Sequence, residues 1–162
     1  MRARACLCAS SLRRWPPQAA SYPTDEAASL ESLKFRASSA SDCFLLAERA
    51  GELVGFVCGT RAPDGPLTHQ SMSEHTPNGA ALCIHSVCVH PDKRRERIGT
   101  KVLEAYVATQ RAAAAQGSGV ATLRLLCKEH LQQFYASAGF ELVGRSEVVH
   151  GTDTWYEMII TL

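Results

Sequence analysis

The chain has 162 residues, of which 46% are hydrophobic and 20% charged, so it is long and apolar enough for one globular domain with a proper core. Its formal net charge of +1 offers no broad attraction for nucleic acid or an anionic membrane, although residues 93–97 are locally basic. No apolar run approaches the ~20 residues that span a bilayer. The seven Cys show neither CxxC pairs nor zinc-ligand spacing. We therefore expect a soluble cytoplasmic protein with reduced thiols and no metal, which binds neither nucleic acid nor membranes.

Residues 1–20 differ in character from the rest of the chain. They contain four Arg and no acidic residue, and they include Trp15-Pro16-Pro17. This composition is typical of an organelle transit peptide, but a disordered tail is the preferred interpretation. The segment contains no convincing strand, since Pro lacks the donor for a ladder hydrogen bond. We expect the folded domain over residues 21–162.

From Tyr22 onward the apolar pattern predicts alternating helices and strands. Thr24 or Asp25 is the expected N-cap of a first helix that reaches Phe35. A β-hairpin should follow, because two apolar, partly β-branched runs are joined by a turn-like spacer. The remaining expected elements are a long loop over 60–79, a strand over 81–89, a helix over 98–115, a strand over 120–127, a short helix over 129–138, and closing strands over 140–143 and 154–160. Together they predict a mixed sheet with helices packed on it.

The most specific pattern lies in residues 85–103, where a short apolar strand runs into a basic turn that opens an amphipathic helix. Backbone N–H groups of residues 95–100 have no intrahelical partner, so clustered anionic oxygens can satisfy them. The helix dipole adds attraction for negative charge. The expected ligand is a pyrophosphate.

The order of these elements resembles the GNAT superfamily of acyl-CoA-dependent N-acetyltransferases. The resemblance rests on the strand, the basic turn with Gly99, the next helix and strand, and the segment Phe134-Tyr-Ala-Ser-Ala-Gly-Phe140. It covers the chain from about Tyr22 to the C-terminus. Three segments are similar to the serotonin (arylalkylamine) N-acetyltransferase family, especially its non-vertebrate members: Tyr22–Ser29, Leu67–Gly79 and Cys127–Tyr135.

The resemblance implies a fold and a reaction. The fold is a mixed α/β GNAT fold, with a mostly antiparallel sheet splayed at a bulge and helices on both faces; residues 1–20 leave its first strand in doubt. The reaction is direct attack of an arylalkylamine on the acetyl group of acetyl-CoA, the cosubstrate, in a ternary complex of a monomeric enzyme. Two alternatives stay open: a GNAT enzyme for polyamines or other amines, and a catalytically weakened acyl-CoA-binding protein.

The resemblance also implies the residues that bind CoA. The backbone of Val87, Cys88 and Val89 would pair with the pantetheine arm, although an ordinary core strand would look the same. The pyrophosphate turn would comprise Arg94, Arg95, Glu96, Arg97, Ile98, Gly99 and Thr100. Arg97 stands where the family has its first Gly, and a left-handed backbone there costs roughly 1 kcal/mol or more. Either CoA binding is weakened, or the guanidinium contacts a phosphate and offsets the strain.

For catalysis, the resemblance implies two alternating His on the strand before the turn, and the matching residues are Cys83 and His85. His85 would be the base that acts through water, although a lone strand His is also compatible with a hydrogen-bonded core residue. A thiol with a pKa of about 8.5 is a poor substitute for imidazole, so slower proton removal or a higher pH optimum is expected. Tyr135 would protonate the departing CoA thiolate, against the alternative of a buried aromatic residue.

For the acceptor amine, the resemblance implies an apolar pocket formed by Tyr22, Pro23, Leu67 and Met72. His69 and His75 lie in the same loop. They lack metal-ligand spacing, and we expect them to be surface or structural residues.

Overall fold

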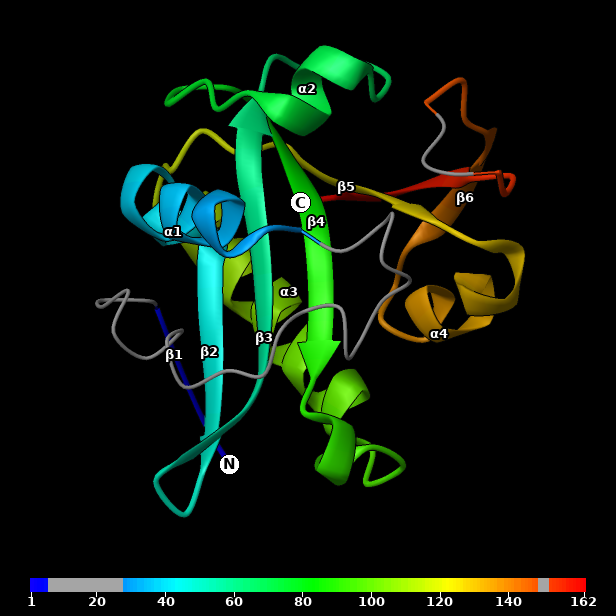
Figure 1. The fold of residues 1–162 in the computed structure, drawn as a ribbon. Coiled ribbons are helices and arrows are strands. Elements are labelled where there is room, and N and C mark those ends of the chain that lie inside the picture. The colour runs from blue at the N-terminus through cyan, green and yellow to red at the C-terminus, as the bar shows by residue number, and fades with distance from the viewer. Residues whose placement is uncertain (6–27, 149–151) are drawn as a thin grey trace. The chain divides into compact units, whose positions relative to one another are not determined.

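The computed structural model describes residues 1–5, 28–148 and 152–162 (Figure 1). Three short 3-10 turns precede β2, α3 and α4. In chain order the helices and strands are β1 (Arg2–Ala5), α1 (Leu30–Ser39), β2 (Phe44–Arg49), β3 (Glu52–Ala62), α2 (His69–Ser73), β4 (Ala81–Val89), α3 (Ile98–Ala115), β5 (Thr122–Cys127), α4 (Gln132–Ala136), β6 (Glu141–Arg145) and β7 (Tyr156–Thr161).

The described strands form one seven-stranded sheet in the order β1-β2-β3-β4-β5-β7-β6. The ladders of β1 with β2, β2 with β3, β5 with β7 and β6 with β7 are antiparallel, and that of β4 with β5 is parallel. A parallel pair requires a crossover connection, which α3 supplies between β4 and β5. The predicted mixed, mostly antiparallel sheet is confirmed, and the bounds of β4 and α3 are those expected.

The doubt about a first strand was wrong. β1 pairs with β2 in a register that runs from Arg2 opposite Glu48 to Ala5 opposite Leu45. Arg and Ala alternate along this strand, but four residues with only Ala at the apolar positions give a weak signal, and the ladder itself is made by main-chain groups. Pro16 and Pro17, the residues that disfavoured a strand, do not belong to β1; with the rest of residues 6–27 they lie outside the described part of the chain.

The first helix begins later than predicted. Ser29 is its N-cap, with an extended backbone, and its hydroxyl accepts a hydrogen bond of 3.0 Å from the backbone N–H of Ser32. Such a bond satisfies one of the N–H groups that a helix start leaves unpaired. The predicted caps Thr24 and Asp25 lie outside the described residues.

The predicted loop over residues 60–79 is also more ordered than expected. β3 continues to Ala62, and α2 occupies His69–Ser73. α2 has a capping box, because Thr68 and Ser71 each accept a hydrogen bond from the other's backbone N–H. Five residues are too few to show a helical period, which is why the sequence pattern did not reveal this helix.

The chain divides into two compact units, residues 1–59 with 86–106, and residues 60–85 with 107–162. In the first unit, α1 and α3 pack on opposite faces of the strands (Figure 1). Leu33 of α1 packs in a buried cluster with Phe44 and Phe56, whose ring centroids are 5.5 Å apart. Neighbouring residues of a strand point to opposite faces, so Gly55 faces α3.

Gly55 allows a close approach within the first unit. A Cβ at this position would lie 2.8 Å from the carbonyl oxygen of Cys88 and 3.4 Å from a methyl group of Val102. The same unit is tied to α3 by the buried Tyr106, whose hydroxyl donates a 2.9 Å hydrogen bond to the carbonyl of Cys43. These contacts hold the start of α3, and therefore the preceding turn, against the strands.

Candidate functional site

The basic turn belongs to the first unit and precedes α3 directly. Its backbone is left-handed at Arg95, with φ of 63°, and at Arg97, with φ of 58°. At the position where the family pattern has its first Gly, Arg97 thus adopts the left-handed conformation that Gly would favour. For a residue other than Gly, this conformation costs roughly 1–2 kcal/mol. Ile98 is buried and anchors the helix start, whereas the four side chains before it are exposed.

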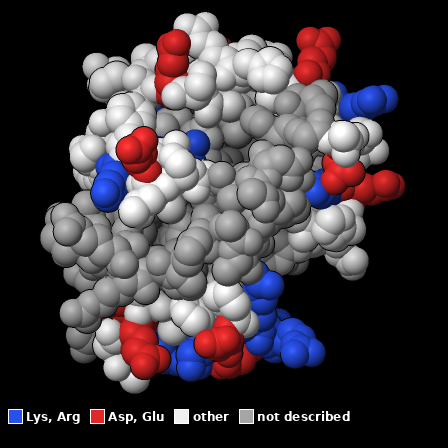
Figure 2. All heavy atoms as spheres, in the orientation of Figure 1, with Lys and Arg blue, Asp and Glu red and all other residues white. Residues whose placement is uncertain are grey.

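Charges of both signs meet around this turn. Figure 2 shows Lys and Arg side chains mixed with acidic ones at the lower edge of the view, where the hairpin and the turn lie in Figure 1. An Nη of Arg49, at the end of β2, lies 2.7 Å from a carboxylate oxygen of Glu96. The hydrogen bond from Arg49 lowers the pKa of the Glu96 carboxyl and raises the pKa of the Arg49 guanidinium. An ion pair therefore links the end of β2 to the turn that was predicted to bind pyrophosphate.

The stretch predicted to pair with pantetheine is the last part of β4. The ladder of β4 with β5 runs from Ala81 opposite Thr122 to Ile84 opposite Leu125, while β4 itself continues to Val89. Val87, Cys88 and Val89 thus lie beyond the last pair of this ladder. Cys88 is buried, and the two Val side chains are half-buried.

His85 lies in the second unit and contacts a hydroxyl group. Its Nε2 is 2.7 Å from Oγ1 of Thr60, a buried residue near the end of β3. The imidazole is half-buried. The contact fixes one ring nitrogen against a hydroxyl that can either donate or accept, which suits a positioned base as well as a structural His.

Cys83 is two residues before His85 on β4, so both side chains point to the same face of the strand. The thiol is fully buried, and burial raises its pKa to about 11. Cys83 therefore stays protonated near neutral pH. It can line a path for protons, but it offers no thiolate to accept one.

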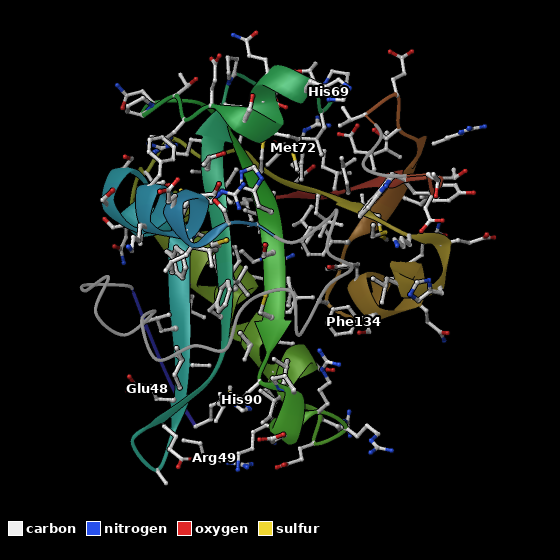
Figure 3. All side chains as sticks on the ribbon, in the orientation of Figure 1. Glu48, Arg49, His69, Met72, His90 and Phe134 are labelled. Carbon is white, nitrogen blue, oxygen red and sulfur yellow. The ribbon has the colours of Figure 1, made fainter. Side chains whose placement is uncertain are left out.

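Two of the predicted acceptor residues pack around Cys83. A buried cluster in the second unit contains Ala62, Leu67, Cys83, Leu126 and Val148, with Met72 and Trp155 partly buried against it. Figure 3 shows Met72 on α2. Tyr22 and Pro23, the other predicted acceptor residues, lie outside the described residues.

Trp155 is the member of this cluster that the sequence analysis missed. The Nζ of Lys128 lies 5.7 Å from the centre of the Trp155 ring, and the same amine forms a 2.7 Å ion pair with Asp153. A cation over an aromatic face helps to fix the ring. The only signal in the sequence was an aromatic residue directly before the last strand.

A buried ion pair borders the same cluster. The Arg124 guanidinium and the Glu157 carboxylate approach to 2.6 Å, and both side chains are largely buried. The backbone N–H of Leu67 donates to both carboxylate oxygens of Glu157 at 3.3 Å. This network joins β5 and β7 to the segment before α2, and it neutralises a carboxylate that would otherwise favour a cationic ligand.

Tyr135 lies on α4 among aromatic rings. Its ring centroid is 5.0 Å from that of Phe134 and 6.0 Å from that of Phe140, and both contacts are edge-on. The side chain is buried. Packing of this kind fixes the ring plane and leaves the direction of the hydroxyl well defined.

His75 and His69 occupy a structural and a surface position, respectively. Nδ1 of His75 accepts a 3.1 Å hydrogen bond from the backbone N–H of Arg61, and His69 is exposed on α2 (Figure 3). Across the described ranges, no group of three His, Cys, Asp or Glu side chains could hold a metal ion. None of the described helices is long and apolar enough to cross a membrane.

Comparison with known proteins decides the family. The family model described as an acetyltransferase (GNAT) domain matches residues 40–142, about two thirds of the chain. The chain belongs to the GNAT acetyltransferase family. The turn and α3 lie within the matched range, as do His85, Tyr135 and most of the apolar cluster around Cys83.

A curated relative points to a narrower similarity. Serotonin N-acetyltransferase of Mesocricetus auratus is 30% identical over 112 residues, which cover 69% of this chain and 52% of that protein. The chain thus spans about half the length of this GNAT relative. The similarity is distant, and it agrees with the narrower resemblance of the sequence without establishing an acceptor.

Solved structures confirm the fold. A GNAT-like decarboxylase, GphF, in complex with isobutyryl-CoA matches with a TM-score of 0.80 at 19% identity, covering 99% of both chains. An aminoglycoside 6'-N-acetyltransferase complexed with coenzyme A matches with a TM-score of 0.66 at 16% identity, covering 99% of this chain and 97% of that one. At these identities, the likeness is one of fold alone.

Proposed function

We propose that the chain transfers the acetyl group of acetyl-CoA to the primary amine of a small arylalkylamine. The observation that carries this proposal is the apolar cluster in which Leu67, Met72 and Trp155 surround Cys83, two residues before His85 on the same strand. In this proposal the indole or phenyl ring of the acceptor lies against these residues, the acceptor cluster, because ligand sites are lined mostly by apolar side chains with few polar groups. Membership of the GNAT family supports acetyl-CoA as the donor.

In this proposal the turn and the first turn of α3 bind the pyrophosphate of CoA. Free N–H groups at the helix start and the dipole of an 18-residue helix favour negative charge there. The exposed guanidinium of Arg97 contacts a phosphate oxygen and offsets part of its backbone strain. Val87 to Val89 supply the main-chain edge for pantetheine.

The chemistry follows from proton transfers at both ends of the reaction. His85 removes one proton from the acceptor ammonium, directly or through water, and the free amine then attacks the acetyl carbonyl carbon. A carbon–nitrogen bond forms, the carbon–sulfur bond breaks, and Tyr135 gives its proton to the departing thiolate. The new amide nitrogen loses its second proton to water, and water returns a proton to the Tyr135 phenolate. No covalent enzyme intermediate is required, and Cys83 is a poor nucleophile because it stays protonated.

A second candidate is a catalytically weakened acyl-CoA-binding protein. Two observations favour it: the left-handed Arg97 in the turn and the protonated thiol at the position of the first family His. A polyamine enzyme receives less support, because the Glu157 carboxylate beside the acceptor cluster is already paired with Arg124.

Release of free CoA thiol from acetyl-CoA separates these functions. We expect turnover with tryptamine and phenylethylamine and a much lower rate with spermine. A higher rate with spermine would favour a polyamine enzyme. Binding of acetyl-CoA with no turnover of any amine would favour the weakened enzyme.

Thr60 should orient His85 for its role as base. Thr60→Val removes the hydroxyl at nearly constant volume, and we expect kcat to fall about tenfold with little change in KM, since a barrier higher by about 1.4 kcal/mol gives that factor. Thr60→Ser keeps a hydroxyl and should restore kcat. Equal kcat values for Thr60→Val and wild type would remove Thr60 from the mechanism.

A further inference from the structure

The first unit contains an acidic group in an unexpected place. Glu96 lies inside the turn proposed to bind pyrophosphate, between the left-handed residues Arg95 and Arg97. An exposed carboxylate at such a position repels an anionic ligand, because its charge acts within a Debye length of the phosphates. We therefore expect tight binding of CoA to require a positive charge that neutralises the Glu96 carboxylate.

Arg49, from a distant part of the sequence, provides this positive charge. Its guanidinium donates a 2.7 Å hydrogen bond to Glu96, across a separation of 47 residues. Arg49 is paired with Glu52 at the last position of the β2–β3 ladder, next to the tight turn at Ala50 and Gly51. Figure 3 places Arg49 at the same end of the unit as His90, which leads into the basic turn. The guanidinium is thus held by a strand end and not by a long loop.

We propose that Arg49 is a determinant of CoA affinity that acts by neutralising Glu96 and fixing the turn around it. The proposal rests on the proposed binding of acyl-CoA at this turn. Both side chains are more than 40% exposed, so the pair adds little to the stability of the fold. The pair should instead affect the affinity for CoA, because substitution of Arg49 would leave the charged Glu96 carboxylate close to the phosphates.

A cycle of single and double substitutions separates neutralisation from direct contact with a phosphate. If Arg49 acts through Glu96, Arg49→Gln weakens binding in the wild-type background and has little effect when Glu96 is already Gln. If Arg49 contacts a phosphate itself, Arg49→Gln weakens binding equally in both backgrounds. The Kd of the double variant, compared with that of Glu96→Gln, therefore distinguishes the two mechanisms.

The experiment is titration calorimetry of CoA into the full chain at low and physiological salt. We expect Arg49→Gln to raise Kd about fivefold at low salt, less at high salt, while Glu96→Gln binds at least as tightly as wild type. The double variant should bind within about twofold of Glu96→Gln. Arg145→Gln, at an exposed position of β6 in the other unit, controls for the general loss of one positive charge. Thermal melts of all variants should coincide with that of wild type.

The failures of the two proposals are distinguishable. Wild-type protein that does not bind CoA would overturn both the proposed function and this inference. Binding of CoA by wild type with an unchanged Kd for Arg49→Gln, or with an equal loss in the Glu96→Gln background, would overturn the role of Arg49 and leave the proposed function standing.

Discussion

Replacement of His85 by Ala is expected to lower kcat with tryptamine by about 10²–10⁴-fold, the usual contribution of a positioned general base. The KM for acetyl-CoA should change little, because the proposed CoA contacts lie in the turn and in the last residues of β4. The acid limb of the pH–rate profile should disappear, since that limb reports protonation of the imidazole. Steady-state kinetics from about pH 6 to pH 9 measure all three quantities, in a range that brackets the ordinary pKa of His.

Two further variants make this test specific. His130→Ala removes an exposed His from the turn before α4 and should leave the rate and the profile unchanged. Cys83→Ala should retain the acid limb, because the thiol, with a pKa of about 11, does not ionise in this range. A His85→Ala enzyme with a normal rate would show that the contact with Thr60 serves the structure alone.

Replacement of Arg124 by Met is expected to destabilise the protein by about 3–5 kcal/mol, the typical cost of leaving one partner of a buried ion pair without its counter-charge. Glu157 would remain buried, with only the N–H of Leu67 among the contacts described above to satisfy its carboxylate. The free energy of unfolding from urea titration measures the loss. Because Glu157 borders the acceptor cluster, binding of aryl amines should weaken as well.

The matched control is Arg145→Met, which removes an exposed Arg from β6 and should cost less than about 0.5 kcal/mol. The double variant Arg124→Met with Glu157→Gln should recover much of the loss, since it removes the uncompensated charge. Equal stability of the Arg124→Met and Arg145→Met variants would show that the pair is not a structural element of the second unit.

Long, regular patterns made most of the fold predictable from sequence. β4 and α3 have the expected bounds because one is a largely apolar run and the other a long, Ala-rich helical stretch. β1 and α2 were missed because each is set by hydrogen bonds of a few residues: a main-chain ladder for the first and a capping box for the second. The alternation of Arg and Ala in β1 is short and weakly apolar, and the five residues of α2 are too few to show a helical period.

The sequence named candidate site residues, but it did not name the partners that the fold gives them. His85, Tyr135, Leu67 and Met72 were named from the resemblance of local motifs. Thr60 is 25 residues from His85, and Leu67 is 90 residues from Glu157, so only the folded sheet reveals these contacts. The same holds for the pair that Arg49 forms with the turn.

Direct transfer of an acetyl group from acetyl-CoA to an aryl amine is tested by initial velocities measured with both acetyl-CoA and tryptamine varied, and with the product identified by mass spectrometry. We expect N-acetyltryptamine and intersecting double-reciprocal lines, as for a ternary complex. Parallel lines would indicate an acetylated enzyme intermediate, and the absence of an N-acetylated product from any aryl amine would contradict the proposed function.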